Sequence, residues 1–114
     1  MPLTTGPIEN VGNLPANATD VRVKILNRTG GTLTGVARVY RLNGTRQLIA
    51  SANFRANANA SSFVTLHLEG GAFQYEVEIT PRQTGGLYSV YGITASGGVI
   101  AAQRFLNSEL VQIL

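Results

Sequence analysis

The most constraining feature of the chain is a short run in which apolar and polar side chains alternate without exception. Residues 73–79 read Phe-Gln-Tyr-Glu-Val-Glu-Ile, and the same alternation recurs less regularly from residue 20 to the end. A period of two places every second side chain on one face of a β-strand. The chain is therefore predicted to be all-β, with strands that bury one face.

Turn signals divide the body into eight predicted strands. The expected ranges are 20–27, 32–42, 45–55, 62–68, 72–80, 87–95, 99–106 and 108–113. Asn43-Gly44 is typical of a type I′ hairpin, in which both central residues have φ > 0. In the second strand we expect Val36 and Tyr40 to share a face, with Arg38 on the other. Short strands at this spacing predict an eight-stranded jelly-roll-like β-sandwich.

The first 19 residues differ from the body and are expected to form an extended N-terminal arm. They hold three of the four prolines and no long apolar run. We therefore divide the chain into a connector arm, 1–19, and a sandwich domain, 20–114. The arm is either a disordered tail or a donor segment that adds to another sheet. For the donor hypothesis, Ile8, Val11 and Leu14 are the candidate subunit-interface residues, although their mixed spacing does not suit one face of a regular strand.

Composition excludes several classes of function. Only 13% of residues are charged, about half of the usual ~25%, so the surface repels copies of itself weakly. The net charge of +3 comes mainly from arginines that are scattered along the chain, which argues against nucleic-acid binding. The chain has no cysteine, hence no disulfide or thiolate metal site. No run approaches the ~18 apolar residues of a membrane span.

The sequence offers little catalytic equipment. A Ser-His-Asp triad would need the single histidine, His67, beside the single aspartate, Asp20, and no Gly-x-Ser-x-Gly elbow is present. Glu76 and Glu78 lie two apart, as paired carboxylates of a glycosidase could, but a polar sheet face paired with arginines is the favoured interpretation. We expect no enzymatic activity and assign no catalytic residue.

The sequence gives equally little indication of a cofactor or ligand site. Asn57 and Asn59 supply amide oxygens without negative charge, so a calcium site there is not expected. The glycine pairs lie between strands and are interpreted as turns, not phosphate loops. The four tyrosines form either a sugar-binding platform or part of the core, and the core is favoured. We expect no cofactor and no metal.

Two segments carry a resemblance to a known family. They are Leu-Tyr-Ser-Val-Tyr-Gly-Ile-Thr-Ala-Ser-Gly-Gly at 87–98 and Gln-Arg-Phe-Leu-Asn-Ser-Glu-Leu-Val-Gln-Ile at 103–113. Together with the arm, they resemble the endospore-appendage type of bacterial fibre or pilus subunit from spore-forming Firmicutes. The resemblance implies a jelly-roll subunit that stacks into a helical fibre through its N-terminal connector. Members of that family cross-link through cysteines, and this chain has none.

The resulting hypothesis is a structural subunit of a self-assembling extracellular fibre on a cell or spore surface, polymerised non-covalently by arm insertion. Its partners would be copies of itself, with neither nucleic acid nor membrane insertion. An extended arm can satisfy open strand edges by β-augmentation. The hypothesis requires the arm to complete another copy's sheet rather than its own. The alternatives are a monomeric carbohydrate- or surface-binding module, with Tyr88, Tyr91 and Arg104 as first positions to test, and a viral or phage structural protein.

Overall fold

The computed structural model describes residues 2–10, 17–68 and 72–113. Within these residues the chain is built from strands and one short 3-10 helix, η1. The elements are β1 (Leu3–Thr4), β2 (Ile8–Glu9), β3 (Asp20–Asn27), β4 (Leu33–Leu42), β5 (Arg46–Ala56), β6 (Ala60–His67), β7 (Gln74–Pro81), β8 (Gly86–Ile93), β9 (Val99–Phe105), η1 (Asn107–Glu109) and β10 (Val111–Gln112).

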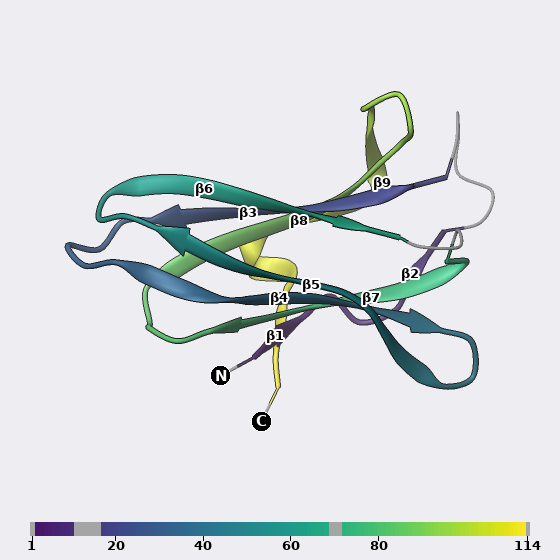
Figure 1. Cartoon of the computed structure of the whole chain (residues 1–114), viewed down its shortest axis with the longest axis horizontal. Coiled ribbons are helices and arrows are strands. Elements are labelled where there is room, and N and C mark those ends of the chain that lie inside the picture. Colours follow the sequence, from purple (N-terminus) through teal and green to yellow (C-terminus); the bar gives the residue numbers. More distant parts are fainter. Residues whose placement is uncertain (1, 11–16, 69–71, 114) are drawn as a thin grey trace.

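The strands form two antiparallel sheets that pack face to face as a β-sandwich (Figure 1). One sheet has the order β10-β1-β7-β4-β5, and β2 also pairs with β7. The other has the order β6-β3-β8-β9. The prediction of an all-β sandwich is therefore confirmed.

The core lies between the two sheets and follows the predicted alternation. β3, β7 and β8 each turn alternate side chains inward, and the large apolar ones among them are at most 3% exposed. The inward residues of these three strands include Val21, Val23, Ile25, Tyr75, Val77, Ile79, Tyr88 and Val90. The Tyr88 ring packs edge-on against Phe54, with 5.8 Å between ring centroids. Burial of such apolar surface is the main stabilising term of the fold.

The predicted faces of the second strand are wrong. In β4, Ala37 and Val39 point into the core, whereas Val36 and Tyr40 lie on the outer side with Arg38. The register against β5 shifts between Val39 and Tyr40, as at a β-bulge. The residue skipped at this shift is Ile49 of β5, and burial along β4 alternates without a break from Leu33 to Tyr40. A strict period of two therefore places Val36, Arg38 and Tyr40 on one face, and the prediction is wrong because it departs from that period.

The hairpin at Asn43-Gly44 is confirmed, but its predicted type is wrong. Leu42 pairs with Arg46, so three residues form the loop between β4 and β5. Gly44 has φ of 92°, while Asn43 is not among the residues with positive φ. A type I′ turn needs positive φ at both central positions.

The end of the chain also differs from prediction. The expected strand 108–113 is reduced to β10, two residues long, preceded by η1. The Glu109 side chain accepts a hydrogen bond from the Leu106 backbone N–H, at 2.8 Å. This local bond helps to form η1 in place of a longer strand.

Candidate assembly site

The described part of the expected arm lies on the body of its own chain. β1 pairs on one side with β7 and on the other with β10, and β2 pairs with β7. Backbone bonds extend these pairings: Thr5 N–H donates to the Val77 carbonyl at 3.0 Å, and Asn10 N–H donates to the Phe73 carbonyl at 2.7 Å. Residues 2–10 of a single copy thus complete their own sheet and do not project from it.

Of the three predicted arm anchors, Ile8 can be placed. Its side chain is 4% exposed and belongs to the core of its own chain. Val11 and Leu14 lie outside the described residues. A role for any of the three in contacts between subunits stays a prediction.

A buried network of polar side chains holds the arm in place. Asn10 and Gln103 are 2% and 1% exposed. The Gln103 Nε2 donates to Asn10 Oδ1 at 2.9 Å and to the Glu9 carbonyl at 3.0 Å. The Tyr75 hydroxyl donates to Gln103 Oε1 at 2.6 Å. A buried polar group is costly unless it is hydrogen-bonded, so these partners depend on the arm staying docked.

Asn10 also links the arm by hydrogen bonds to the residues that lead into β3. Its amide nitrogen donates to the carbonyls of Ala18 and Ala72, at 3.1 and 2.9 Å, and its Oδ1 accepts from the Ala18 N–H at 2.8 Å. Sequence reasoning missed Asn10 and Gln103. Asn10 lies among turn-forming residues and Gln103 lies within β9, and a single amide in either setting carries no periodic signal that could have identified it.

The edge strands of both sheets expose large hydrophobic side chains. In the described part of the molecule the edges are β5 and β10 in one sheet and β6 and β9 in the other. Each edge carries one large hydrophobic residue that is more than half exposed; they are Leu48 on β5, Phe63 on β6, Val99 on β9 and Val111 on β10. Unpaired edge groups and exposed apolar side chains both favour association.

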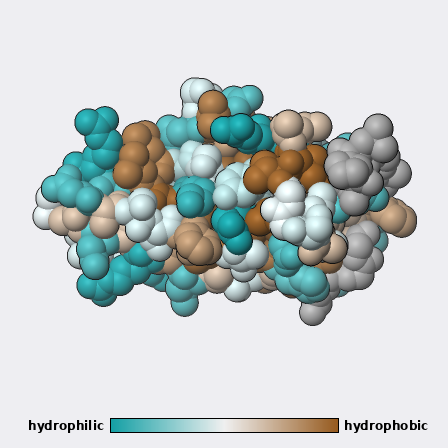
Figure 2. All heavy atoms as spheres, turned by 90° about the horizontal axis from the view of Figure 1, so that it is seen from above, coloured by the Kyte–Doolittle hydropathy of each residue, from teal (hydrophilic) through white to brown (hydrophobic). Residues whose placement is uncertain are grey.

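β6 is the edge with the least protection against pairing. It runs for eight residues without Asp, Glu, Lys or Arg, whereas natural edges are usually blunted by charge or proline. Arg22 and Lys24 of the neighbouring strand β3 lie over the Phe63 ring, at 4.8 and 5.1 Å from its centroid. Figure 2 looks down on this sheet and shows hydrophobic residues in separate areas among hydrophilic ones.

The outer face of the other sheet is a network of ion pairs. Arg46 reaches across β4 and donates to Glu76 at 2.7 Å and to Glu78 at 2.9 Å, and its guanidinium lies 3.5 Å from the Tyr40 ring centroid. The hydrogen bond with Glu76 raises the pKa of Arg46. Glu76 also accepts a hydrogen bond from the Thr4 hydroxyl. The interpretation of Glu76 and Glu78 as a polar face paired with arginine is confirmed.

His67 and Asp20 are brought together across β6 and β3. The His67 Nδ1 lies 2.9 Å from Asp20 Oδ1, and the imidazole is mostly exposed. The Thr19 hydroxyl donates to the other Asp20 oxygen at 3.0 Å. A nucleophile would have to donate to the imidazole, and in the described part of the chain this pair has no such donor.

The tyrosines do not form one platform. Tyr75 and Tyr88 are buried between the sheets, as the core interpretation predicts, and Tyr40 and Tyr91 lie on outer faces of different sheets. Over residues 2–10, 17–68 and 72–113, no cluster of three or more His, Cys, Asp or Glu could hold a metal ion. In the same ranges no helix is long and apolar enough to cross a membrane.

Comparisons with known proteins add no further assignment. A scan against protein-family models, a search of curated proteins and a search of solved structures each found no match.

Proposed function

We propose that the chain is a structural subunit of an extracellular helical fibre, of the endospore-appendage type that its sequence resembles. In this proposal copies assemble without covalent links. The arm of one subunit takes, on a neighbour, the place that it occupies on its own body. The observation that carries the proposal is the set of four edge strands, each of which exposes a large hydrophobic side chain.

Exchange of the arm requires no new type of contact. β1 and β2 add to β7 through backbone hydrogen bonds, and the same bonds form equally well between two copies. Residue 10 is separated from Ala18, the next buried residue described, by only seven residues. Fully extended, such a segment spans at most ~25–30 Å. The molecule measures 42 × 30 × 22 Å, so a directly adjoining copy is within reach.

The order in which the strands cross between sheets supports a jelly roll. β3 lies between β6 and β8 in one sheet, while β4 lies between β5 and β7 in the other. From β3 to β8, every connection except the β4–β5 hairpin therefore crosses from one sheet to the other. Such long-range antiparallel pairing between strands distant in sequence is typical of Greek-key and jelly-roll sandwiches.

An engineered disulfide tests the exchange directly, because the natural chain has no cysteine. Glu9 and Gln74 are exposed and directly opposite each other on β2 and β7. The double variant Glu9→Cys/Gln74→Cys should be oxidised after assembly and then run on a denaturing gel. Arm exchange predicts a ladder of covalent multimers, whereas an arm that remains on its own body gives cross-linked monomers only.

A matched control uses two residues that pair inside one hairpin. Thr34 and Arg55 lie opposite each other on β4 and β5, so Thr34→Cys/Arg55→Cys should give cross-linked monomers in every state. Oxidising the Glu9→Cys/Gln74→Cys protein as a dilute monomer should lock the arm and prevent assembly, and reduction should restore it. Filaments formed by the locked monomer would refute arm exchange.

A monomeric carbohydrate- or surface-binding module is the second candidate. The observation that favours it is the docking of the arm on its own body, which leaves a complete sandwich in a single copy. Size-exclusion chromatography and negative-stain electron microscopy at high concentration separate the two candidates. A single monomer peak without filaments supports the module, and filaments support the fibre.

A further inference from the structure

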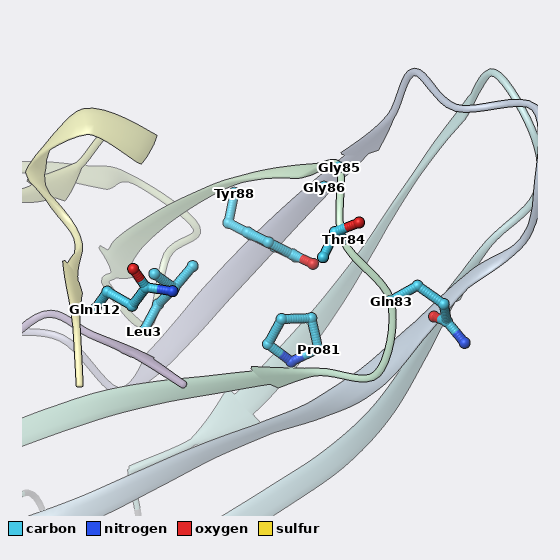
Figure 3. A pocket seen from close by; sticks show the side chains of 8 residues that line it. All are labelled: Leu3, Pro81, Gln83, Thr84, Gly85, Gly86, Tyr88 and Gln112. Carbon is cyan, nitrogen blue, oxygen red and sulfur yellow. The ribbon is translucent and has the colours of Figure 1, made fainter. Parts of the chain in front are cut away.

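A cavity opens at one end of the sandwich, between the beginning of β1 and the connection from β7 to β8. Its volume is about 190 Å³. Leu3 and Gln112 form one side, and Tyr88, Pro81 and residues 83–86 form the other (Figure 3). An apolar cavity of ~150 Å³ is known to accept a benzene ring. This cavity is therefore large enough for a six-membered ring.

The hydroxyl of Tyr88 has no hydrogen-bond partner although it is buried. Tyr88 is 3% exposed, and among the described residues its Oη is the buried side-chain oxygen or nitrogen that lacks a partner. In Figure 3 the side chain extends from β8 toward Thr84 at the cavity wall. Burial raises the pKa of Tyr88, so the phenol stays neutral and can donate. An unpaired buried hydroxyl is costly, which makes this group a strong recognition point for a ligand that supplies an acceptor.

Gly86 leaves room for the Tyr88 hydroxyl beside the cavity wall. A Cβ atom at this position would lie 2.4 Å from the Tyr88 hydroxyl and 2.6 Å from Leu33. Any larger residue would therefore displace the phenol from the wall. The absence of a side chain at Gly86 is therefore required for the Tyr88 hydroxyl to occupy its present position.

The lining combines apolar and uncharged polar groups. Leu3, Pro81 and the Tyr88 ring offer apolar surface, while Gln112 and Thr84 offer amide and hydroxyl groups. No lining residue is charged. A ligand that matches this chemistry is neutral and has an apolar ring face edged by hydroxyls. Pockets that fix a ligand through few polar groups on a mostly apolar wall are typical of small-molecule sites.

We propose that this cavity binds one uncharged sugar ring, with the Tyr88 hydroxyl donating to a ring or hydroxyl oxygen. The site does not depend on the fibre function, because one copy contains every lining residue. It gives the second candidate, the carbohydrate-binding module, a specific site and rests on that candidate for its class of ligand. The sugar is either a free monosaccharide or the terminal unit of a glycan, since both present the same ring.

Saturation-transfer NMR tests the proposal in monomers and in assemblies alike. The probes are glucose, galactose, mannose and N-acetylglucosamine, each as the monosaccharide and as a disaccharide with that unit at its end. We expect transfer to at least one probe at millimolar to tens of millimolar concentration. Preference for the disaccharide indicates a glycan end, and equal signals indicate the free sugar. Absence of transfer to all probes overturns the proposal.

Substitutions in and near the cavity test whether the sugar binds there. Tyr88→Phe should weaken binding about tenfold, the effect of one good hydrogen bond, and should leave the fold at least as stable because no protein group loses a partner. Thr84→Trp, at an exposed position, should fill the cavity and abolish binding. Ser89→Ala removes a hydroxyl from the outer face of the same strand and should leave binding unchanged. Binding that survives both Tyr88→Phe and Thr84→Trp places the sugar elsewhere and refutes the site.

Discussion

The buried amide of Gln103 should be a major determinant of how tightly the arm is held. Gln103→Leu keeps the approximate volume but removes three hydrogen bonds, to Tyr75, Asn10 and Glu9. Tyr75 is fully buried and loses its partner, which alone costs ~1–3 kcal/mol. Asn10 retains its bonds to Ala18 and Ala72, so it loses less. We expect the free energy of unfolding to fall by about 2–4 kcal/mol, a large part of the ~5–15 kcal/mol of a typical domain.

Urea denaturation measures this loss of stability, and a double-mutant cycle shows how much of it comes from the unpaired Tyr75 hydroxyl. Tyr75→Phe removes the hydroxyl that Gln103→Leu would leave unpaired. Gln103→Leu should therefore cost about 1 kcal/mol less in the Tyr75→Phe background than in the natural chain. Hydrogen exchange supplies a second measurement, since Gln103→Leu should lower the protection of the Thr5 and Asn10 amides. A loss below ~0.5 kcal/mol, with arm protection unchanged, refutes the claim that this network holds the arm.

Three further predictions concern other positions. Gly35→Ala should destabilise by about 1–3 kcal/mol because its Cβ would lie 2.4 Å from the Phe54 ring, whereas Gly30→Ala, with open space around it, should have little effect in the same thermal melt. Asn27 is fully buried and donates to three backbone carbonyls, so Asn27→Ala should cost ~3 kcal/mol in urea denaturation. Burial raises the pKa of Tyr75, so its unfolded form ionises first and stability should fall above pH ~10; Tyr75→Phe should flatten this decline.

The regular strands could be predicted because their side chains alternate over a long enough run. Residues 20–27 form β3 with the predicted bounds, since Val21, Val23 and Ile25 share one buried face. Phe73 shows where the same argument fails. It continues the alternation of 73–79 but precedes β7 and is 72% exposed, because the strand begins one residue later.

The arm could not be placed from the sequence, for a physical reason. β1 and β2 are two residues long, which is too short to show a period. Their positions are fixed by long-range partners, such as the bond between Asn10 and Gln103, which are 93 residues apart. Local propensity carries no information about such contacts. The Tyr88 cavity was missed likewise, since Leu3, Tyr88 and Gln112 meet only through the fold.

Docking of the arm on its own body sets a condition for the proposed fibre. An arm docked on its own body and an arm docked on a neighbour make the same contacts, so the two states differ mainly in the concentration of the arm near its site. A short linker gives the arm an effective concentration of roughly millimolar at the site on its own body. Exchange therefore prevails only where contacts between copies add to it, and the exposed edges are the described surfaces best suited to supply them. Phe63 lies on an eight-residue edge strand without Asp, Glu, Lys or Arg, so Phe63→Ala should raise the critical concentration for filaments measured by sedimentation. Phe73→Ala, a matched loss of an exposed ring outside the strands, should not. If Phe63→Ala leaves that concentration unchanged, the β6 edge does not drive assembly.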